Sequence, residues 1–255
     1  MPTTSEKDSS VWPGGGLPFL FPFAGRVWNK GKLYKYELES GVFDMPLHGF
    51  SWAKGWELLS SNADQATLIL TASDDTLKIF PFIFALKMSI HLSQSKLRLV
   101  VDMSHLSSKD PKNKKMPVAI GWHPYFKVAS AASVAISAKT VYPVTGVGGA
   151  GLPQPALDLL GSGPWPLPNP LLSSLILSNL ANPTSKLSPA PTHEVAITAG
   201  PDSIMKHVVT WTNLPTQFHC IEPWMSLPDA VASQSGCQWL EAGESLKVWL
   251  DVECH

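Results

Sequence analysis

The chain has 255 residues, of which 44% are hydrophobic and only 15% are charged. This composition supports a large buried core, and the length suits one big all-β domain as well as two smaller ones. Nineteen Lys and Arg residues against twenty Asp and Glu residues give a formal net charge of −1. No basic excess therefore indicates nucleic acid or an anionic membrane as a partner, and a small neutral ligand fits better.

The cysteines and the N-terminal residues indicate the compartment. Cys220, Cys237 and Cys254 are odd in number and lack metal-type spacing, which argues against a disulfide framework and for a reducing environment. Residues 1–16 are polar and then glycine-rich, without the apolar region of a signal peptide. We expect them to form a flexible segment before a single domain over residues 17–255. No run of eighteen apolar residues occurs, so the sequence predicts a cytoplasmic protein that does not span a membrane.

Short apolar runs at regular spacing predict the secondary structure. No stretch of three helical turns with a clean 3.6-residue period interrupts them, and Asn, Asp and Ser clusters separate them, as in antiparallel β architectures. The expected strands are residues 33–38, 56–59, 66–72, 82–92, 96–103, 118–120, 194–198, 207–212 and 246–252.

Residues 143–191 differ in character because ten prolines fall within them. Such density excludes central strands and long helices, so we expect mostly loop here, as an ordered excursion or a lid. Residues 171–180 are one short helical candidate, weakened by a Ser-Ser pair and a following Asn-Pro.

The most informative stretch is residues 116–126, where an apolar run leads through Gly121 into Trp122-His123-Pro124. Because proline disfavours helical backbone at the residue before it, we expect His123 on extended backbone where a strand leaves a sheet. A neutral imidazole among aromatic rings, with an unperturbed pKa of about 6.5, is a good proton donor or acceptor near neutrality. A hydrogen-bonded core histidine is the alternative at this point.

Three other polar residues stand in comparable settings. Arg26 follows a glycine, His48 precedes Gly49-Phe50, and Glu222 lies between an apolar strand and Pro223-Trp224. Burial would raise the pKa of the Glu222 carboxyl above its ordinary value of about 4.3, which makes a better base at neutral pH. The alternatives are a surface charge for Arg26 and Glu222 and a core position for His48.

Five stretches between residues 21 and 252 carry a family resemblance by their order and spacing. They are Phe21-Pro22 with Gly25-Arg26, Met45-Pro46 with His48-Gly49-Phe50, Met116-Pro117 with Gly121-Trp122-His123-Pro124-Tyr125-Phe126, Ile221-Glu222-Pro223-Trp224, and Ala242-Gly243-Glu244-Ser245. Together they resemble the aldose 1-epimerase (galactose mutarotase-like) family, and the His-Pro-Tyr-Phe motif is the most specific of them.

The resemblance implies an all-β, antiparallel β-supersandwich that binds a small-molecule sugar in an open cleft across one sheet. It implies no metal or organic cofactor, and a monomer or weak homodimer. The implied activity is the interconversion of α- and β-anomers of an aldohexose, with Glu222 as the base and His123 as the acid. His48 and Arg26 would hydrogen-bond the sugar. The candidate walls for the apolar face of the sugar are Trp122, Tyr125, Trp224 and Phe50.

Two departures from the family pattern keep alternatives open. Many members carry a sugar-binding aspartate between the two catalytic motifs, where this chain offers only Asp158 or Asp202. Members that act on hexose 6-phosphates tend to have an arginine after the His-Gly-Phe motif, whereas Ser51-Trp52-Ala53-Lys54 follows here. A glucose-6-phosphate 1-epimerase, with Lys54 or Arg26 reaching the phosphate, is therefore the second interpretation. A non-catalytic sugar-binding module of the same fold is the third.

Overall fold

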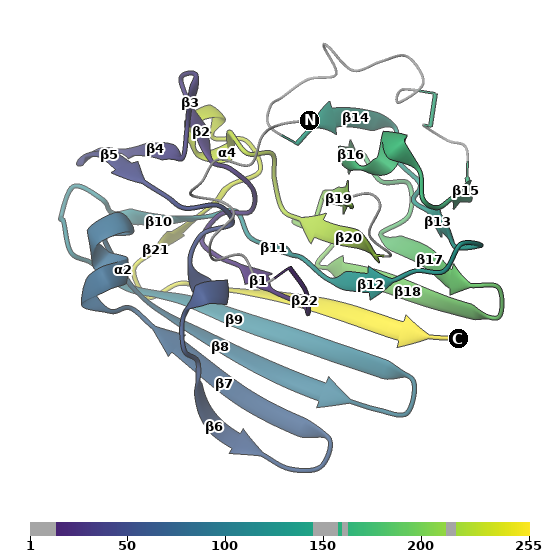
Figure 1. The fold of residues 1–255 in the computed structure, drawn as a ribbon. Helices are drawn as coiled ribbons and strands as arrows, with labels where there is room; N and C mark the ends of the chain where they lie inside the picture. Colours follow the sequence, from purple (N-terminus) through teal and green to yellow (C-terminus); the bar gives the residue numbers. More distant parts are fainter. Residues whose placement is uncertain (1–13, 145–157, 160–162, 213–217) are drawn as a thin grey trace.

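The computed structural model describes residues 14–144, 158–159, 163–212 and 218–255. Two antiparallel sheets, one of nine and one of seven strands, make up most of this part of the chain. The nine-stranded sheet forms the lower layer in Figure 1, and most of the seven-stranded sheet lies above its right half. The predicted all-β, antiparallel architecture is confirmed.

The nine-stranded sheet runs in the order β15-β13-β17-β18-β22-β9-β8-β7-β6. Side chains alternate between its two faces. In β8, for example, Phe82, Phe84 and Leu86 are fully buried, whereas Ile83 between them is exposed. In sheet order the strands are Trp165–Pro166, Ser133–Ala135, Thr184–Ala190, His193–Gly200, Ser245–Cys254, Lys96–Ser108, Phe82–Leu92, Gln65–Thr71 and Glu57–Ser61.

The seven-stranded sheet runs in the order β1-β11-β20-β19-β16-β14, and β12 pairs with β20 beside β11. Strand β20 is buried along almost its whole length, which explains its near-continuous apolar sequence. In sheet order the strands are Phe19–Leu20, Gly121–Trp122, Phe218–Trp224, His207–Trp211, Ser174–Ser178 and Thr140–Pro143, with β12 at Tyr125–Lys127.

Smaller elements surround the two sheets. Three two-stranded sheets pair β2 with β3, β4 with β5, and β10 with β21. Their strands are Trp28–Asn29, Lys32–Leu33, Lys35–Leu38, Gly41–Asp44, Lys115–Val118 and Gln238–Glu241. The helical turns are η1 (Ser51–Ala53), α2 (Asp74–Ile79), η2 (Pro170–Leu172) and α4 (Ala230–Ser233).

Helix α2 was not among the expected elements, because it begins in one of the Ser and Asp clusters that separate the expected strands. Ser73 caps it by accepting a hydrogen bond from the Thr76 backbone N–H, while the Thr76 hydroxyl accepts one from the Ser73 N–H. This reciprocal pair satisfies two N–H groups at the start of the helix. The helix spans only six residues, so no 3.6-residue period is long enough to reveal it in the sequence.

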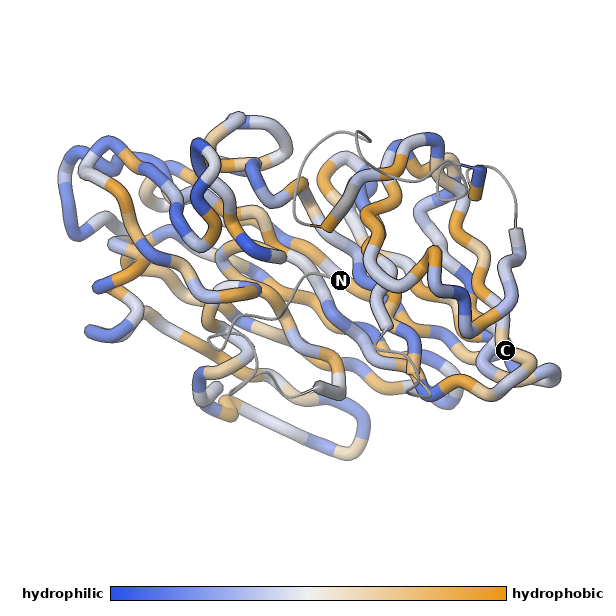
Figure 2. Tube along the Cα trace, turned by 45° about the horizontal axis from the view of Figure 1, so that its top comes forward, coloured by the Kyte–Doolittle hydropathy of each residue, from blue (hydrophilic) through white to orange (hydrophobic). Residues whose placement is uncertain are grey.

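The main hydrophobic core lies between the two large sheets and draws residues from both. Phe21 is near its centre, with ring centroids 5.0 Å from Phe84 and 5.7 Å from both Phe50 and Phe80. Figure 2 shows hydrophobic residues along the strands and hydrophilic ones gathered in the turns. The core holds the two sheets together and thereby fixes the positions of strands that belong to different thirds of the chain.

The expectation of mostly loop over residues 143–191 is wrong for its described second half. Strand β16 lies between β14 and β19, and β17 lies between β13 and β18. Leu175, Ile176 and Leu177 of β16 are all buried, so an apolar run covered on both faces decides the structure there rather than the prolines nearby. The helical candidate at 171–180 is wrong, because these residues form the end of the short turn η2 and then strand β16. Pro166 does lie at an edge, because β15 is the outermost strand of its sheet.

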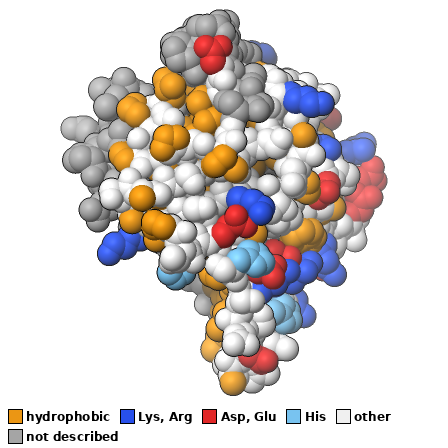
Figure 3. Space-filling view, turned by 90° about the vertical axis from the view of Figure 1, so that its right-hand side faces the viewer, with side chains coloured by type: hydrophobic (Ala, Val, Ile, Leu, Met, Phe, Trp, Pro, Cys, Tyr) orange, Lys and Arg blue, Asp and Glu red, His pale blue; other side chains and the backbone are white. Residues whose placement is uncertain are grey.

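In the described ranges, neither the helical turns nor the two short α-helices have the length and apolar character that a membrane span requires. Figure 3, which views the side to the right in Figure 1, shows Lys and Arg side chains beside Asp and Glu side chains. This mixture on one face agrees with the near-zero net charge.

Candidate active site

A break in the seven-stranded sheet brings His123 and Glu222 together. Strand β20 pairs with β12 through residues 218–220 and with β11 through Trp224, so residues 221–223 face the gap between β11 and β12. His123 and Pro124 occupy that gap. Pro223 is tolerated in this central strand because it has no ladder partner on the side of the gap. The His123 Nε2 and Glu222 Oε1 atoms are 3.2 Å apart.

The backbone of the segment before β1 holds His123 in place. The His123 N–H donates to the Pro18 carbonyl at 2.9 Å, and the Tyr125 N–H donates to the Gly16 carbonyl at 3.0 Å. The Tyr125 ring stacks on the imidazole, with ring centroids 4.8 Å apart and an interplanar angle of 13°. The expectation that a strand ends where His123 follows agrees with β11, which ends at Trp122.

Burial shifts the two ionisable groups of the pair in opposite directions. Glu222 is only 1% exposed, and burial raises the pKa of its carboxyl well above the ordinary value, although a hydrogen bond from Trp224 acts the other way. That bond runs from the Trp224 Nε1–H to Glu222 Oε2, at 3.2 Å. Burial lowers the pKa of His123 to about 3. The uncharged forms of both groups are therefore favoured.

His48 lies beside the pair and is fixed by Gly25. The His48 N–H donates to the Gly25 carbonyl at 2.9 Å, and the Gly25 N–H donates to His48 Nδ1 at 3.0 Å. Because Nδ1 accepts, the neutral imidazole carries its proton on Nε2. The His48 ring meets the His123 ring edge-on at 5.1 Å. Burial lowers the pKa of His48, and electrostatic interactions with His123 and Arg26 lower it further.

Two glycines of the sequence motifs leave room for Trp224. A Cβ atom on Gly25 would lie 2.8 Å from Trp224 Cη2, and one on Gly121 would lie 2.6 Å from Trp224 Cδ1. Both distances are shorter than real contacts, so a side chain at either position would displace the indole. Gly25 also has φ +77°, a region that disfavours other residues. The indole that donates to Glu222 is therefore clamped between two backbone segments.

Arg26 lies at the margin of the site and is half-buried. Its Nε–H donates to the Tyr34 hydroxyl at 3.0 Å. The guanidinium is close enough to His48 for its charge to disfavour the imidazolium form. The structure thus brings Arg26, His48, His123 and Glu222 into one neighbourhood.

The expected aromatic walls are placed differently from the prediction. Trp122 is fully buried in the main core against Phe19, at 4.7 Å between ring centroids, and Phe50 is buried in the phenylalanine cluster. Trp224 is also buried: it packs in a second apolar cluster, donates to Glu222 and meets the His48 ring edge-on. Residues 121–124 alternate in direction, so placing His123 at the gap sends Trp122 to the opposite face. Of the four, Tyr125 alone is half-buried.

Trp211 and Cys220 are site neighbours that the sequence analysis did not select. Trp211 lies opposite Cys220 in the β19–β20 register and approaches the His123 ring at 6.0 Å. Phe218 packs on both Trp211 and Tyr125 at 5.3 Å. Donor atoms of His123, Cys220 and Glu222 all lie within 4.8 Å of one another. Cys220 stands two residues before Glu222, so strand alternation on β20 was the signal available for it.

The sugar-binding role considered for Asp158 or Asp202 and the phosphate contact considered for Lys54 or Arg26 stay predictions. Asp202 is exposed in the turn between β18 and β19, and Asp158 is exposed in a two-residue described segment. Lys54 follows η1, and its charge acts on Asp75 at the start of α2.

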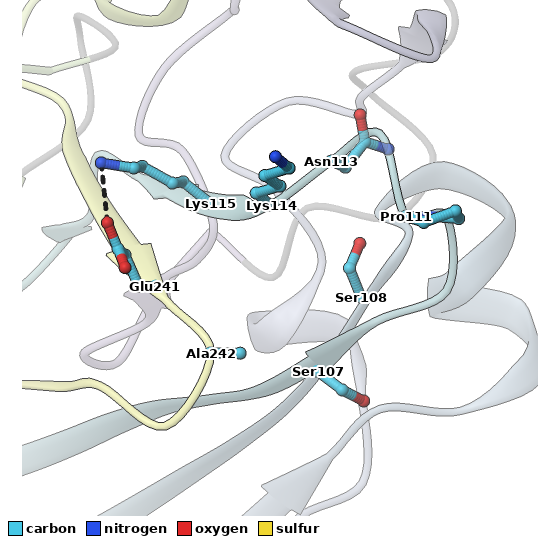
Figure 4. A pocket seen from close by; sticks show the side chains of 8 residues that line it. All are labelled: Ser107, Ser108, Pro111, Asn113, Lys114, Lys115, Glu241 and Ala242. Atoms are coloured by element: carbon cyan, nitrogen blue, oxygen red, sulfur yellow. Dashed lines mark ion pairs between the residues drawn. The ribbon is translucent and has the colours of Figure 1, made fainter.

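A pocket of about 440 Å³ lies elsewhere, between the turn after β9 and strand β21 (Figure 4). Lys115 and Glu241 form an ion pair of 2.9 Å at its edge. Its lining residues include no histidine, and their single carboxylate is held by Lys115, so the pocket lacks an acid–base pair. The lining residues are Ser107, Ser108, Pro111, Asn113, Lys114, Lys115, Glu241 and Ala242.

The two stacked antiparallel sheets and the pair at the sheet break define a galactose mutarotase-like protein. A family model described as aldose 1-epimerase matches residues 4–253, and the chain belongs to this family. A comparison with curated proteins found no match.

Solved structures share the fold at low sequence identity. A protein of Synechocystis sp. PCC 6803 is 22% identical, with a TM-score of 0.74 over 94% of this chain and 78% of its own. A galactose mutarotase-like protein from Lactobacillus casei is 21% identical, with a TM-score of 0.72 over 94% and 85%. A galactose 1-epimerase from Lactobacillus acidophilus is 17% identical, with a TM-score of 0.68 over 99% and 83%. At these identities the likeness establishes the fold alone.

Proposed function

We propose that the chain is an aldose 1-epimerase that interconverts the α- and β-anomers of an aldohexose by general acid–base catalysis. Its family and fold support a mutarotase-type function. The observation that carries the finer proposal is the buried 3.2 Å contact between His123 Nε2 and Glu222 Oε1, held at a break in a central sheet.

The chemistry of anomer exchange matches a closely spaced pair. A base must take the proton of the anomeric hydroxyl while an acid protonates the ring oxygen; the ring then opens to the aldehyde, the C1–C2 bond rotates, and the steps reverse on the other face. Both oxygens are bonded to the same carbon, C1. The base and the acid must therefore also lie close together, as Glu222 and His123 do.

The pKa shifts keep one proton on the Glu222–His123 pair, and the mechanism needs that proton. Because burial raises the pKa of Glu222 and lowers that of His123, the resting pair holds one transferable proton and no net charge. A bound sugar hydroxyl favours transfer of that proton to His123, which leaves Glu222 as the base and His123 as the acid. Loss of the proton at high pH, or gain of a second one at low pH, stops the exchange.

The surrounding residues take supporting roles in this proposal. The His48 Nε2–H and the Arg26 guanidinium donate to sugar oxygens, and the Tyr125 ring provides an apolar surface next to His123. Trp224 positions Glu222 through its indole N–H rather than forming a wall. The pair is nearly inaccessible in this structure, so an entering sugar displaces side chains that now cover it.

Mutarotation rates test the proposal directly. The decay of optical rotation is followed for α-glucose and α-galactose, with a coupled assay on glucose 6-phosphate beside them. We expect rates above those in buffer for at least one free aldose, and a loss of that excess in Glu222→Gln. Activity restricted to glucose 6-phosphate would favour the phosphorylated substrate instead. Rates equal to buffer on all three would favour a non-catalytic sugar-binding module.

A further inference from the structure

Three different metal-binding side chains meet at the break in the seven-stranded sheet. One donor atom from each of His123, Cys220 and Glu222 lies within 4.8 Å of the others, and all three residues are buried. Cys220 and Glu222 are two apart on β20, so their side chains leave the same face of the strand. The acid–base mechanism uses His123 and Glu222 but gives no role to the thiol of Cys220, which lies opposite Trp211 in the β19–β20 register.

We propose that His123, Cys220 and Glu222 form a binding site for a thiophilic divalent cation of the zinc class, and that the bound ion excludes the sugar. The inhibitory half of this statement rests on the proposed epimerase function, whereas the binding half does not. The ion would bond to the imidazole nitrogen, the thiolate sulfur and a carboxylate oxygen. Those are the ligand types that zinc takes in proteins.

The geometry needs little adjustment. Zinc lies about 2.0 Å from a histidine nitrogen or carboxylate oxygen and about 2.3 Å from a thiolate sulfur, so two ligands of a tetrahedral ion are roughly 3.3 Å apart. The His123 Nε2 to Glu222 Oε1 distance is already 3.2 Å. The Cys220 sulfur lies within 4.8 Å and must approach by about 1.5 Å at most. Three protein ligands leave a fourth position for water.

The surroundings suit a ligated carboxylate. Trp224 donates its indole N–H to Glu222 Oε2, which leaves Oε1 directed at His123. Such a second partner orients a ligand and strengthens its hold on the metal. On binding, two protons pass to solvent, one from the Cys220 thiol as the sulfur–zinc bond forms and one from the Glu222–His123 pair, so the two positive charges of the ion replace those of the two protons.

The ligand set also determines which ions compete with the sugar. A thiolate with an imidazole selects zinc or cadmium, whereas magnesium and calcium prefer sites made of oxygen atoms. The ion would occupy the lone pairs of the nitrogen and the oxygen that must exchange protons with the substrate. We therefore expect zinc to raise KM without lowering kcat, because sugar and ion compete for the same atoms.

The first experiment measures zinc inhibition of mutarotation in Cys220→Ser and Cys220→Ala, each relative to its own metal-free rate. We expect both variants to need more than about tenfold more zinc for half-inhibition, since losing even an outer partner of a metal ligand costs that much. Cys254→Ser is the matched control, because this thiol is exposed and far along β22. Equal zinc sensitivity in the wild type and both Cys220 variants would overturn the proposal, as would inhibition by magnesium at the same concentrations.

The second experiment detects the site without any sugar. Cobalt(II) titrated into the protein should produce a thiolate-to-cobalt charge-transfer band in the near ultraviolet. We expect this band in the wild type and in Cys254→Ser and its absence in both Cys220 variants. A band that survives in the Cys220 variants, or that never forms, refutes the site. If the protein has no epimerase activity, this spectrum still decides the metal site, so the two proposals fail separately.

Discussion

Glu222→Gln removes the proposed base while keeping nearly the same side-chain shape. The amide has nearly the shape of the carboxylate, and its oxygen can still accept the hydrogen bond that Trp224 donates. It cannot take a proton from the anomeric hydroxyl. We therefore expect kcat to fall by about 10²- to 10⁴-fold, the usual contribution of a general base, which corresponds to about 2.7–5.5 kcal/mol in the barrier.

The same substitution should leave the protein at least as stable. Glu222 is buried, and its raised pKa means that folding disfavours the carboxylate relative to the neutral acid. A neutral amide removes the cost of burying a charge, so the urea midpoint should not fall.

His123→Asn should reduce kcat by a factor comparable to that of Glu222→Gln. The two losses should not multiply in the double variant, because neither group completes the proton exchange alone.

Polarimetry on the free aldose that proves active gives kcat for each variant, and urea titration gives stability. Glu241→Gln is the matched control: its carboxylate lies at the pocket of Figure 4 and pairs with Lys115, away from the sheet break. It should keep the wild-type rate. Near-full mutarotation by Glu222→Gln on every aldose tried would show that the base lies elsewhere.

Three further predictions follow from the same contacts. Trp224→Phe removes the hydrogen bond that lowers the pKa of Glu222, so the fall in kcat at high pH should move to higher pH; Trp56→Phe, whose indole bonds a backbone carbonyl, should not move it. Gly25→Ala should cost about 1–3 kcal/mol of unfolding free energy because of its φ and the close indole. Gly55→Ala should cost less unfolding free energy, because a Cβ atom at Gly55 meets open space. Equal losses in the two variants would contradict the close packing of Trp224 against Gly25. Burial lowers the pKa of four histidines, to about 3 or 4 for three of them, whereas the unfolded chain binds those protons near pH 6.5. The folded state therefore loses stability as pH falls from 6.5 towards 4, partly offset by the raised pKa of Glu222, and equal urea midpoints at pH 7.5 and 5 would refute this. These histidines are His48, His123, His207 and His219.

The prolines allowed the sequence to predict an extended backbone at His123 and at Glu222, whereas the pairing of the two residues was implied by the family resemblance. Pro124 and Pro223 both follow their polar residue, and both mark the place where the ladder between β11, β12 and β20 is interrupted. Gly25 and Gly121 could be recognised in the sequence as parts of motifs. The reason for a glycine at both positions is the nearby Trp224 ring, which only the folded structure reveals.

Other features depended on contacts between distant segments. An indole looks the same in a sequence whether it contacts a ligand or the core, so the sequence could not show that Trp122 packs in the main core. Strand β16 was not predicted because of the many prolines around it. Its apolar run is also so short that it suits a loop, a helix or a buried strand. Cysteine spacing along the chain could not reveal Cys220 beside His123, because that neighbourhood arises from pairing between β12 and β20.

The position of β22 has a consequence for how the polypeptide acquires its shape. This strand joins β18, from the 193–200 segment, to β9, from the 96–108 segment, in the middle of the nine-stranded sheet. During synthesis, β18 and β9 each remain an unpaired edge of their half of the sheet until residues 245–254 leave the ribosome. Such late, long-range closure is slow, and open edges are prone to pair with other chains meanwhile. We expect recombinant yield to depend strongly on temperature and chaperone supply, and substitutions in β22 to reduce the soluble fraction before they affect the rate of any folded molecule.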